Sequence, residues 1–135
     1  MILHCNFEEL RALASAGEVL VAEAHARTGG VAAPPEGVVM VEHLIPRLTG
    51  DMSIETLEDQ RRVQGAVTVL VDDLRRRMDH QIIETTPGNE EALNFYFDYA
   101  HSRSVLHRLD RMGAEMAAIV ELIAGGNPAG VTFPD

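Results

Sequence analysis

Residues 89–124, NEEALNFYFDYAHSRSVLHRLDRMGAEMAAIVELIA, are the stretch of the sequence that decides the fold. Asn89 is a favourable helix N-cap, acidic residues follow it in the first turn, and Gly125 and Gly126 end the pattern. The stretch therefore predicts one uninterrupted helix, which is about 52 Å long at roughly 1.5 Å per residue. A compact globule of this chain length has a radius of gyration of roughly 14 Å, so the helix should extend beyond a compact monomer.

Apolar residues in this stretch recur at alternating steps of four and three, which is the spacing of a coiled-coil-like seam. The seam consists of Phe95, Tyr99, Ser102, Leu106, Leu109, Gly113, Met116, Val120 and Ile123. A second apolar face, made by Leu93, Phe97 and Ala100, lies roughly opposite the seam in the N-terminal half. Large exposed apolar patches usually mark contact sites, so we expect either a second copy of the chain or residues 38–48 to cover this face.

A first helix is expected over residues 7–27. Asn6 and Glu9 have the spacing of a capping box, and apolar residues follow at steps of three and four. The apolar stripe of this helix is rich in small residues, namely Ala14, Gly17 and Ala24. A neighbouring helix should therefore approach it closely.

A second helix is expected over residues 54–84, with Ser53 as its N-cap and a core line of valine, leucine, methionine and isoleucine. The short reversal Thr-Thr-Pro-Gly at 85–88 connects it to the long C-terminal helix. The two helices should therefore form an antiparallel hairpin.

The segment between the first two helices is ambiguous. Residues 28–37 contain two glycines and two prolines and predict a linker. Residues 38–42 begin with a β-branched run, which favours a strand paired with residues 1–5 in a two-stranded ribbon. The alternative is a short helix, disturbed by Pro46, that turns its apolar residues toward the core.

These patterns together predict a mainly α protein. We expect a single domain over residues 1–135, an elongated antiparallel bundle of three principal helices with the small β ribbon beside it, and an irregular tail over 125–135.

Composition excludes several classes of chemistry. All eleven basic residues are arginine, so Schiff-base lysines and the phosphate-binding lysine of a P-loop do not occur in this sequence. The single cysteine, Cys5, excludes a disulfide within the chain and a multi-cysteine metal site, and its residue type favours a small buried hydrophobe. A formal charge of -10 disfavours nucleic-acid binding. Without a signal peptide or a long apolar run, we expect a cytoplasmic protein that does not enter the membrane.

The strongest candidate for a polar site lies in the long helix. Asp98 and His101 are one turn apart, and with Tyr99 and Ser102 they could form a ligand-binding pocket inside the bundle. The alternative is that Asp98 and His101 are a hydrogen-bonded pair at a partly buried helix crossing. A carboxylate and an imidazole at this spacing also occur in ferritin-like metal bundles, but the further glutamates and the second Glu-x-x-His that those bundles require are missing here. We expect no metal and no cofactor.

Two weaker motifs lie near the end of the second helix. His80 and Glu84 have the His-x-x-x-Glu spacing of hemerythrin-like di-iron bundles, although the other histidine pairs of that fold are missing. Arg75 and His80, separated by four residues, resemble the motif of HEPN-type helical ribonucleases, and the resemblance implies activation of an RNA 2′-hydroxyl at a dimer interface. Ordinary ion pairs on a solvated helix face account for the same residues.

No catalytic residues are indicated. We therefore expect a non-enzymatic interaction or regulatory module that acts as a homodimer, with Leu93, Phe97 and Ala100 in the interface and a protein partner possible. The first alternative is a small-molecule- or metal-binding bundle that uses a polar pocket around Asp98 and His101. The second is a HEPN-like ribonuclease that uses Arg75 and His80.

Overall fold

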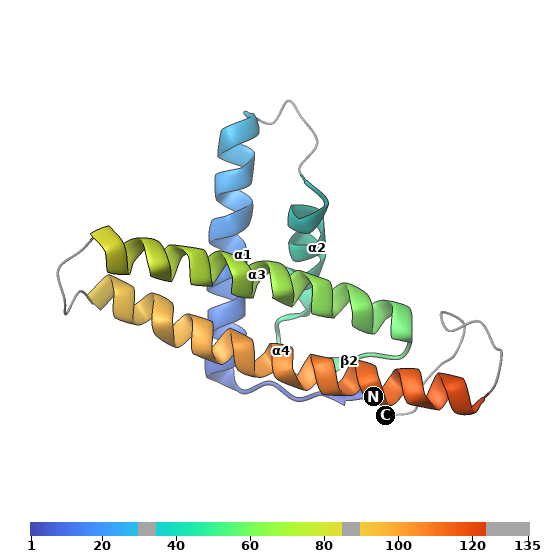
Figure 1. Ribbon diagram of the computed structural model, residues 1–135. Helices are drawn as coiled ribbons and strands as arrows, with labels where there is room; N and C mark the ends of the chain where they lie inside the picture. The colour runs from blue at the N-terminus through green and yellow to red at the C-terminus, as the bar shows by residue number, and fades with distance from the viewer. Residues whose placement is uncertain (30–34, 85–89, 124–135) are drawn as a thin grey trace.

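Four α-helices and a two-stranded ribbon make up the part of the chain that the computed structural model describes, which is residues 1–29, 35–84 and 90–123. In chain order the elements are β1 (Ile2–Leu3), α1 (Phe7–Thr28), α2 (Glu36–Leu44), the short 3₁₀ helix η1 (Ile45–Arg47), β2 (Met52–Ser53), α3 (Leu57–Glu84) and α4 (Glu90–Leu122) (Figure 1). The predicted mainly α bundle is confirmed.

α3 and α4 lie side by side and antiparallel, as the sequence predicted (Figure 1). α4 is a single helix of 33 residues, which corresponds to about 50 Å. The two helices bury apolar side chains against each other, and Val67, Leu70, Val105, Leu109 and Met116 are completely buried. The seam deduced for the C-terminal half of α4 therefore faces the core, except at its last residue, Ile123, which is 58% exposed directly after the helix ends.

Gln60 and Gly113 mark a close crossing between α3 and α4. The Gln60 side chain is 1% exposed, and its Nε2 donates hydrogen bonds of 2.7 Å to the carbonyl oxygen of Leu109 and to Oε1 of Gln64. A Cβ added to Gly113 would lie 2.7 Å from this nitrogen. Glycine at 113 thus leaves room for a buried amide that is hydrogen-bonded across the hairpin.

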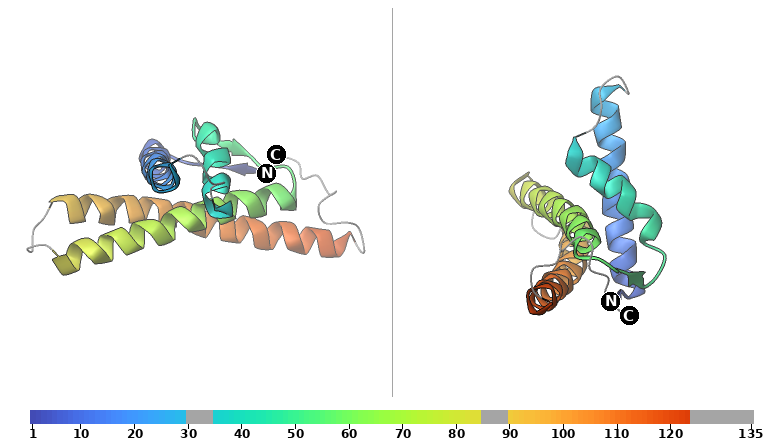
Figure 2. Two further views of the ribbon diagram at one scale, coloured as in Figure 1. Left: turned by 90° about the horizontal axis from the view of Figure 1, so that it is seen from above. Right: turned by 90° about the vertical axis from the view of Figure 1, so that its right-hand side faces the viewer.

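α1 and α2 run across the hairpin, and both lie on the same side of it (Figure 2). This arrangement refines the expected bundle, because α1 crosses the α3–α4 hairpin instead of running along it. α1 and α2 approach each other at Gly17, where an added Cβ would lie 3.2 Å from Cγ1 of Ile45 and 3.3 Å from Cγ1 of Val41. The close approach expected at the small residues of α1 occurs here.

The prediction of a strand over 38–42 is wrong. These residues belong to α2, which buries Val38, Val41 and Leu44 on one face, and Pro46 lies in η1 directly after it. The alternative of a short helix is correct. Tertiary burial of three apolar side chains at helical spacing outweighs the modest strand preference of the valines.

The N-terminal ribbon forms, but its second strand is β2. β1 and β2 are antiparallel, with Ile2 opposite Ser53 and Leu3 opposite Met52. Ser53 therefore does not cap α3. Instead, Thr56 Oγ1 accepts a hydrogen bond of 3.0 Å from the backbone N–H of Asp59, so the helix begins three residues later than expected.

Other predicted features match the structure or fall outside its described part. Asn6 and Glu9 form the expected capping box of α1, with both hydrogen bonds at 2.9 Å. The reversal at 85–88, the N-cap Asn89 and the tail 125–135 lie outside the described residues, as does most of the linker 28–37. Among the helices described, none combines the length and apolar composition needed to cross a membrane.

Candidate functional site

Asp98 and His101, the centre of the predicted polar pocket, lie near the crossing of α4 with α1. The Asp98 side chain is 19% exposed, and its Oδ1 lies 3.7 Å from Nη2 of Arg11 in α1. Burial raises the pKa of Asp98, and the charges of Arg11 and His101 oppose that effect. The carboxylate of Asp98 therefore lies near two groups that lower its pKa, the guanidinium of Arg11 from α1 and the imidazole of His101.

Ser102 and Tyr99 have different surroundings from this pair. Ser102 is completely buried, and its hydroxyl makes no hydrogen bond within the described part of the chain. Tyr99 is half-buried beside the core, and the guanidinium of Arg103 lies 5.9 Å from the centre of its ring. The cavities found beside α2, beside the N-terminal strand and beside Asp73 are lined by none of the four residues predicted to share a pocket.

The second predicted feature, the apolar face of the N-terminal half of α4, is exposed. The exposed fractions are 52% for Leu93 and 48% for Phe97, and Ala100 is also exposed. Tyr96, which was not among the residues predicted for this face, is 52% exposed and meets Phe97 edge-to-face, with ring centres 5.9 Å apart. We call Leu93, Tyr96, Phe97 and Ala100 the α4 patch.

The expectation that residues 38–48 cover this face is wrong. These residues form α2 and η1, which pack on α1 and α3 on one side of the hairpin (Figure 2). By helical periodicity, Leu93, Tyr96 and Ala100 lie on the side of α4 opposite to its buried residues Ser102 and Val105. The α4 patch thus points away from the rest of the described chain.

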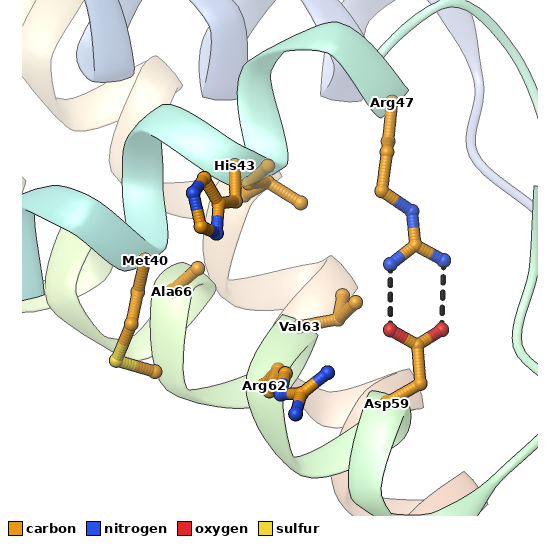
Figure 3. A pocket seen from close by; sticks show the side chains of 8 residues that line it. Met40, His43, Arg47, Asp59, Arg62, Val63 and Ala66 are labelled. Atoms are coloured by element: carbon orange, nitrogen blue, oxygen red, sulfur yellow. Dashed lines mark hydrogen bonds and ion pairs between the residues drawn. The ribbon is translucent and has the colours of Figure 1, made fainter.

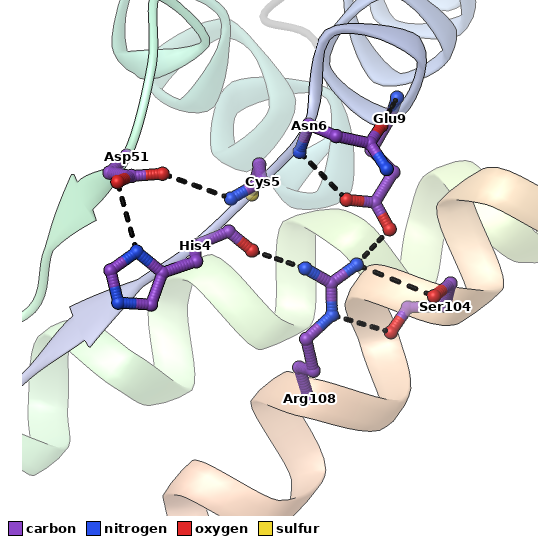
Figure 4. Close-up of polar contacts among 7 residues, drawn as sticks. All are labelled: His4, Cys5, Asn6, Glu9, Asp51, Ser104 and Arg108. Atoms are coloured by element: carbon purple, nitrogen blue, oxygen red, sulfur yellow. Dashed lines mark hydrogen bonds and ion pairs between the residues drawn. The ribbon is translucent and has the colours of Figure 1, made fainter.

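A polar network that the sequence did not reveal joins the N-terminal segment to α4 (Figure 4). The guanidinium of Arg108 contacts the carboxylate of Glu9 and the carbonyl oxygen of His4. Arg108 also donates to the hydroxyl of Ser104 at 3.3 Å. Glu9 is only 4% exposed, and its other oxygen accepts the N–H of Asn6 at 2.9 Å. A buried carboxylate with both oxygens hydrogen-bonded holds these segments together, and we call the network of Glu9 and Arg108 the clamp.

Asp51 extends this clamp to the ribbon (Figure 4). Its carboxylate lies 2.9 Å from Nδ1 of His4 and accepts the N–H of Cys5 at 3.2 Å. Burial raises the pKa of the Cys5 thiol, so the thiolate is disfavoured at neutral pH. The local chemistry of Cys5 fits a packed side chain better than a nucleophile.

Arg75 and His80, the pair that resembles the ribonuclease motif, are both exposed on α3. His80 lines a cavity of about 430 Å³ that Arg75 does not line. The cavity is dominated by an ion-pair network in which Asp73, 4% exposed, bonds to Arg76 and Arg77, while Arg77 also bonds to Glu23. These arginines are held by carboxylates of the chain itself.

The metal motif at His80 and Glu84 rests in part on a side chain outside the described set. Within that set, no three histidine, cysteine, aspartate or glutamate side chains lie close enough together to hold a metal ion.

Another cavity, of about 420 Å³, lies between the N-terminal strand and α4, where Arg108, Arg111 and Met112 line it.

Comparisons of the chain with protein families, with characterised proteins and with solved structures give no match.

Two features of the described structure are candidates for a functional site, and they differ in whether their groups already have partners within the chain. The Glu9 and Arg108 network is internally satisfied, whereas the α4 patch presents three large apolar side chains to solvent.

Proposed function

We propose that this protein is a non-enzymatic interaction or regulatory module that associates with a second copy of itself through the α4 patch. The observation that supports the proposal is the exposure of Leu93, Tyr96 and Phe97, each about half accessible, on the outer face of a helix whose inner face is in the core. Contiguous apolar side chains of this size are a common mark of a contact surface.

The sequence of α4 favours a second copy as the occupant because the patch is complementary to itself. In an antiparallel pairing with its two-fold axis between Tyr96 and Phe97, Leu93 lies opposite the small Ala100 of the copy. In the same register, Arg103 lies opposite position 90, which is a glutamate in the sequence. Size and charge therefore match in one arrangement.

The arrangement of the helices leaves room for this pairing. α1 and α2 occupy one side of the hairpin (Figure 2), and by helical periodicity the α4 patch lies on the face of α4 opposite to its buried residues, which leaves this face open to a second hairpin. The result is a larger bundle built around two antiparallel α4 helices.

The magnitude of the interaction indicates a weak dimer. Burying the exposed half of a large apolar side chain contributes about 1 kcal/mol, so three such side chains per copy contribute about 6 kcal/mol in a dimer. Aromatic pairs add about 0.5–1.5 kcal/mol each. Because association costs at least about 4 kcal/mol, the net gain is at most about 5 kcal/mol, and we expect dissociation constants of roughly a few tenths of a millimolar or weaker.

Sedimentation velocity over a concentration series tests the proposal. Phe97→Glu should weaken dimerisation at least tenfold, because it places a charge in the centre of the patch. Val19→Glu is the matched control, since Val19 is a 43% exposed apolar residue of α1 outside the patch, and it should leave dimerisation unchanged. Circular dichroism checks that both variants remain folded. A wild-type chain that is monomeric at every concentration, or equal effects of the two substitutions, would refute the proposal.

A further inference from the structure

A cavity of about 240 Å³ lies between the α2–η1 segment and the first half of α3 (Figure 3). It is lined by Met40, His43, Leu44, Arg47, Asp59, Arg62, Val63 and Ala66. The cavity does not include any residue of the α4 patch, so a ligand bound in it would not depend on dimerisation.

The inner wall of the cavity is apolar. Leu44, Val63 and Ala66 are between 1% and 3% exposed and are fixed in the core. Met40 forms the adjustable part of the wall, and its methyl group lies over Gly65, where an added Cβ would collide with it. A fixed wall and one flexible thioether suit the apolar body of a small molecule.

The hydrogen-bond acceptors at the rim are already occupied. Both carboxylate oxygens of Asp59 accept hydrogen bonds from Arg47, at 2.8 and 2.9 Å (Figure 3). Arg47 also donates to the carbonyl oxygen of Ser53 at 3.0 Å. The two charges compensate each other, and the pair offers a ligand no free carboxylate.

The remaining polar groups at the rim are the guanidinium of Arg62, which only donates, and the imidazole of His43, which donates through one ring nitrogen when neutral. Arg62 uses one nitrogen, Nη2, in a 2.6 Å bond to Glu58 Oε1, and its guanidinium has further N–H groups. His43 makes no hydrogen bond or ion pair with any described residue, and Figure 3 shows its ring beside the cavity. Arg62 also lies in the second turn of α3, near the positive end of the helix dipole. The rim therefore favours an anionic acceptor.

We infer that this cavity binds a small organic monocarboxylate, with its apolar body against Met40, Val63 and Ala66 and its carboxylate toward Arg62 and His43. The cavity opens to solvent beside the exposed residues His43 and Arg62, so its volume indicates the size of the part of the ligand that lies inside it. An apolar cavity of about 150 Å³ accepts benzene, so this cavity accommodates roughly ten non-hydrogen atoms.

Benzoate is a suitable probe, with benzyl alcohol and inorganic phosphate as comparators. Binding is followed through the NMR signal of the Met40 methyl group, which is assigned from the Met40→Leu spectrum. Benzoate should shift this signal saturably. Benzyl alcohol should bind about tenfold more weakly because it lacks the charge-assisted hydrogen bond, and phosphate should leave the methyl signal in place because it lacks the apolar body.

Three substitutions locate the binding site. Arg62→Gln should weaken benzoate binding about tenfold, whereas the matched control Arg61→Gln, at an exposed neighbour outside the cavity, should leave it unchanged. Glu58→Gln removes the competing carboxylate and should tighten binding. Thermal unfolding verifies that each variant is folded. The inference is overturned if benzoate gives no saturable shift, or if Arg61→Gln weakens binding as much as Arg62→Gln, which would indicate attraction by net charge alone.

Discussion

The C-terminal and N-terminal halves of α4 belong to one continuous helix, and both turn an apolar seam inward, but their outer faces differ. In the C-terminal half, the outward positions His107, Arg111 and Ala114 are polar or small, and large apolar side chains become exposed at the last turn, where Leu122 and Ile123 are 84% and 58% exposed. In the N-terminal half, the outward positions include Leu93 and Phe97, which are 52% and 48% exposed. The C-terminal half is amphipathic up to its last turn, whereas the N-terminal half is apolar on two sides.

This difference shows what periodicity in a sequence determines and what it leaves open. A helical spacing of apolar residues establishes that a helix has an apolar face, but the packing of other elements decides whether that face is covered. In the described structure α3 and α1 cover only the inner side of α4. The N-terminal half consequently keeps an apolar surface that a second molecule is able to bury.

The largest effect is expected when an aspartate replaces a leucine of the buried seam, and the same replacement on the outer face of the N-terminal half serves as the comparison. Leu109→Asp buries an unpaired charge at a completely buried position and should abolish the cooperative fold, because the cost of several kcal/mol approaches a total stability of about 5–15 kcal/mol. Leu93→Asp should change the free energy of unfolding of the monomer by less than about 0.5 kcal/mol. Urea unfolding followed by circular dichroism at low protein concentration measures both. Equal destabilisation by the two substitutions would contradict the exposure of Leu93.

Two arginines provide an intermediate test. Arg108→Ala removes the cation beside the buried carboxylate of Glu9 and should cost about 2–4 kcal/mol. Arg103→Ala removes a contact with the ring of Tyr99 at an exposed position and should cost about 0.5–1 kcal/mol. The comparison is made by urea unfolding near neutral pH. If Arg103→Ala lowered the free energy of unfolding more than Arg108→Ala, the contact between Glu9 and Arg108 would not be a major contribution to stability.

The smallest effect is expected to be a gain in stability. Ser102→Ala removes a buried hydroxyl that has no hydrogen-bond partner among the described residues and should stabilise the fold by about 1 kcal/mol. Ser104→Ala gives the same gain in helix propensity at an exposed position, where it also loses a hydrogen bond from Arg108. The difference between their melting temperatures isolates the contribution of burial. Destabilisation by Ser102→Ala would show that its hydroxyl has a partner.

The long helices could be predicted from the sequence because local signals specify them. The capping box at Asn6 and the apolar spacing of α3 and α4 involve residues close together in the chain. The sequence of α2 favours a strand because Val38 and Val39, near its start, have a strand preference. The buried face of α2 becomes apparent only from the elements that pack against it. β2 contains two residues, which is too short for any alternation to be visible.

The candidate sites show the same limit. Leu93, Phe97 and Ala100 could be placed on one face by periodicity alone, whereas the Glu9 and Arg108 contact joins positions 99 residues apart and leaves no local trace. The cavity beside Met40 requires α2 to be a helix, so the strand interpretation concealed it. Residues of one helix are predictable as a group, but the pairing of distant elements depends on the whole fold.

Glu9 has two roles, and their combination has a consequence for local motion. One carboxylate oxygen completes the cap of α1, and the other binds Arg108 in α4. Helix ends ordinarily fray at little cost, and their amide hydrogens exchange quickly with solvent. Here, opening the first turn of α1 would also break the link to α4, so the Glu9 amide should exchange as slowly as those of the core.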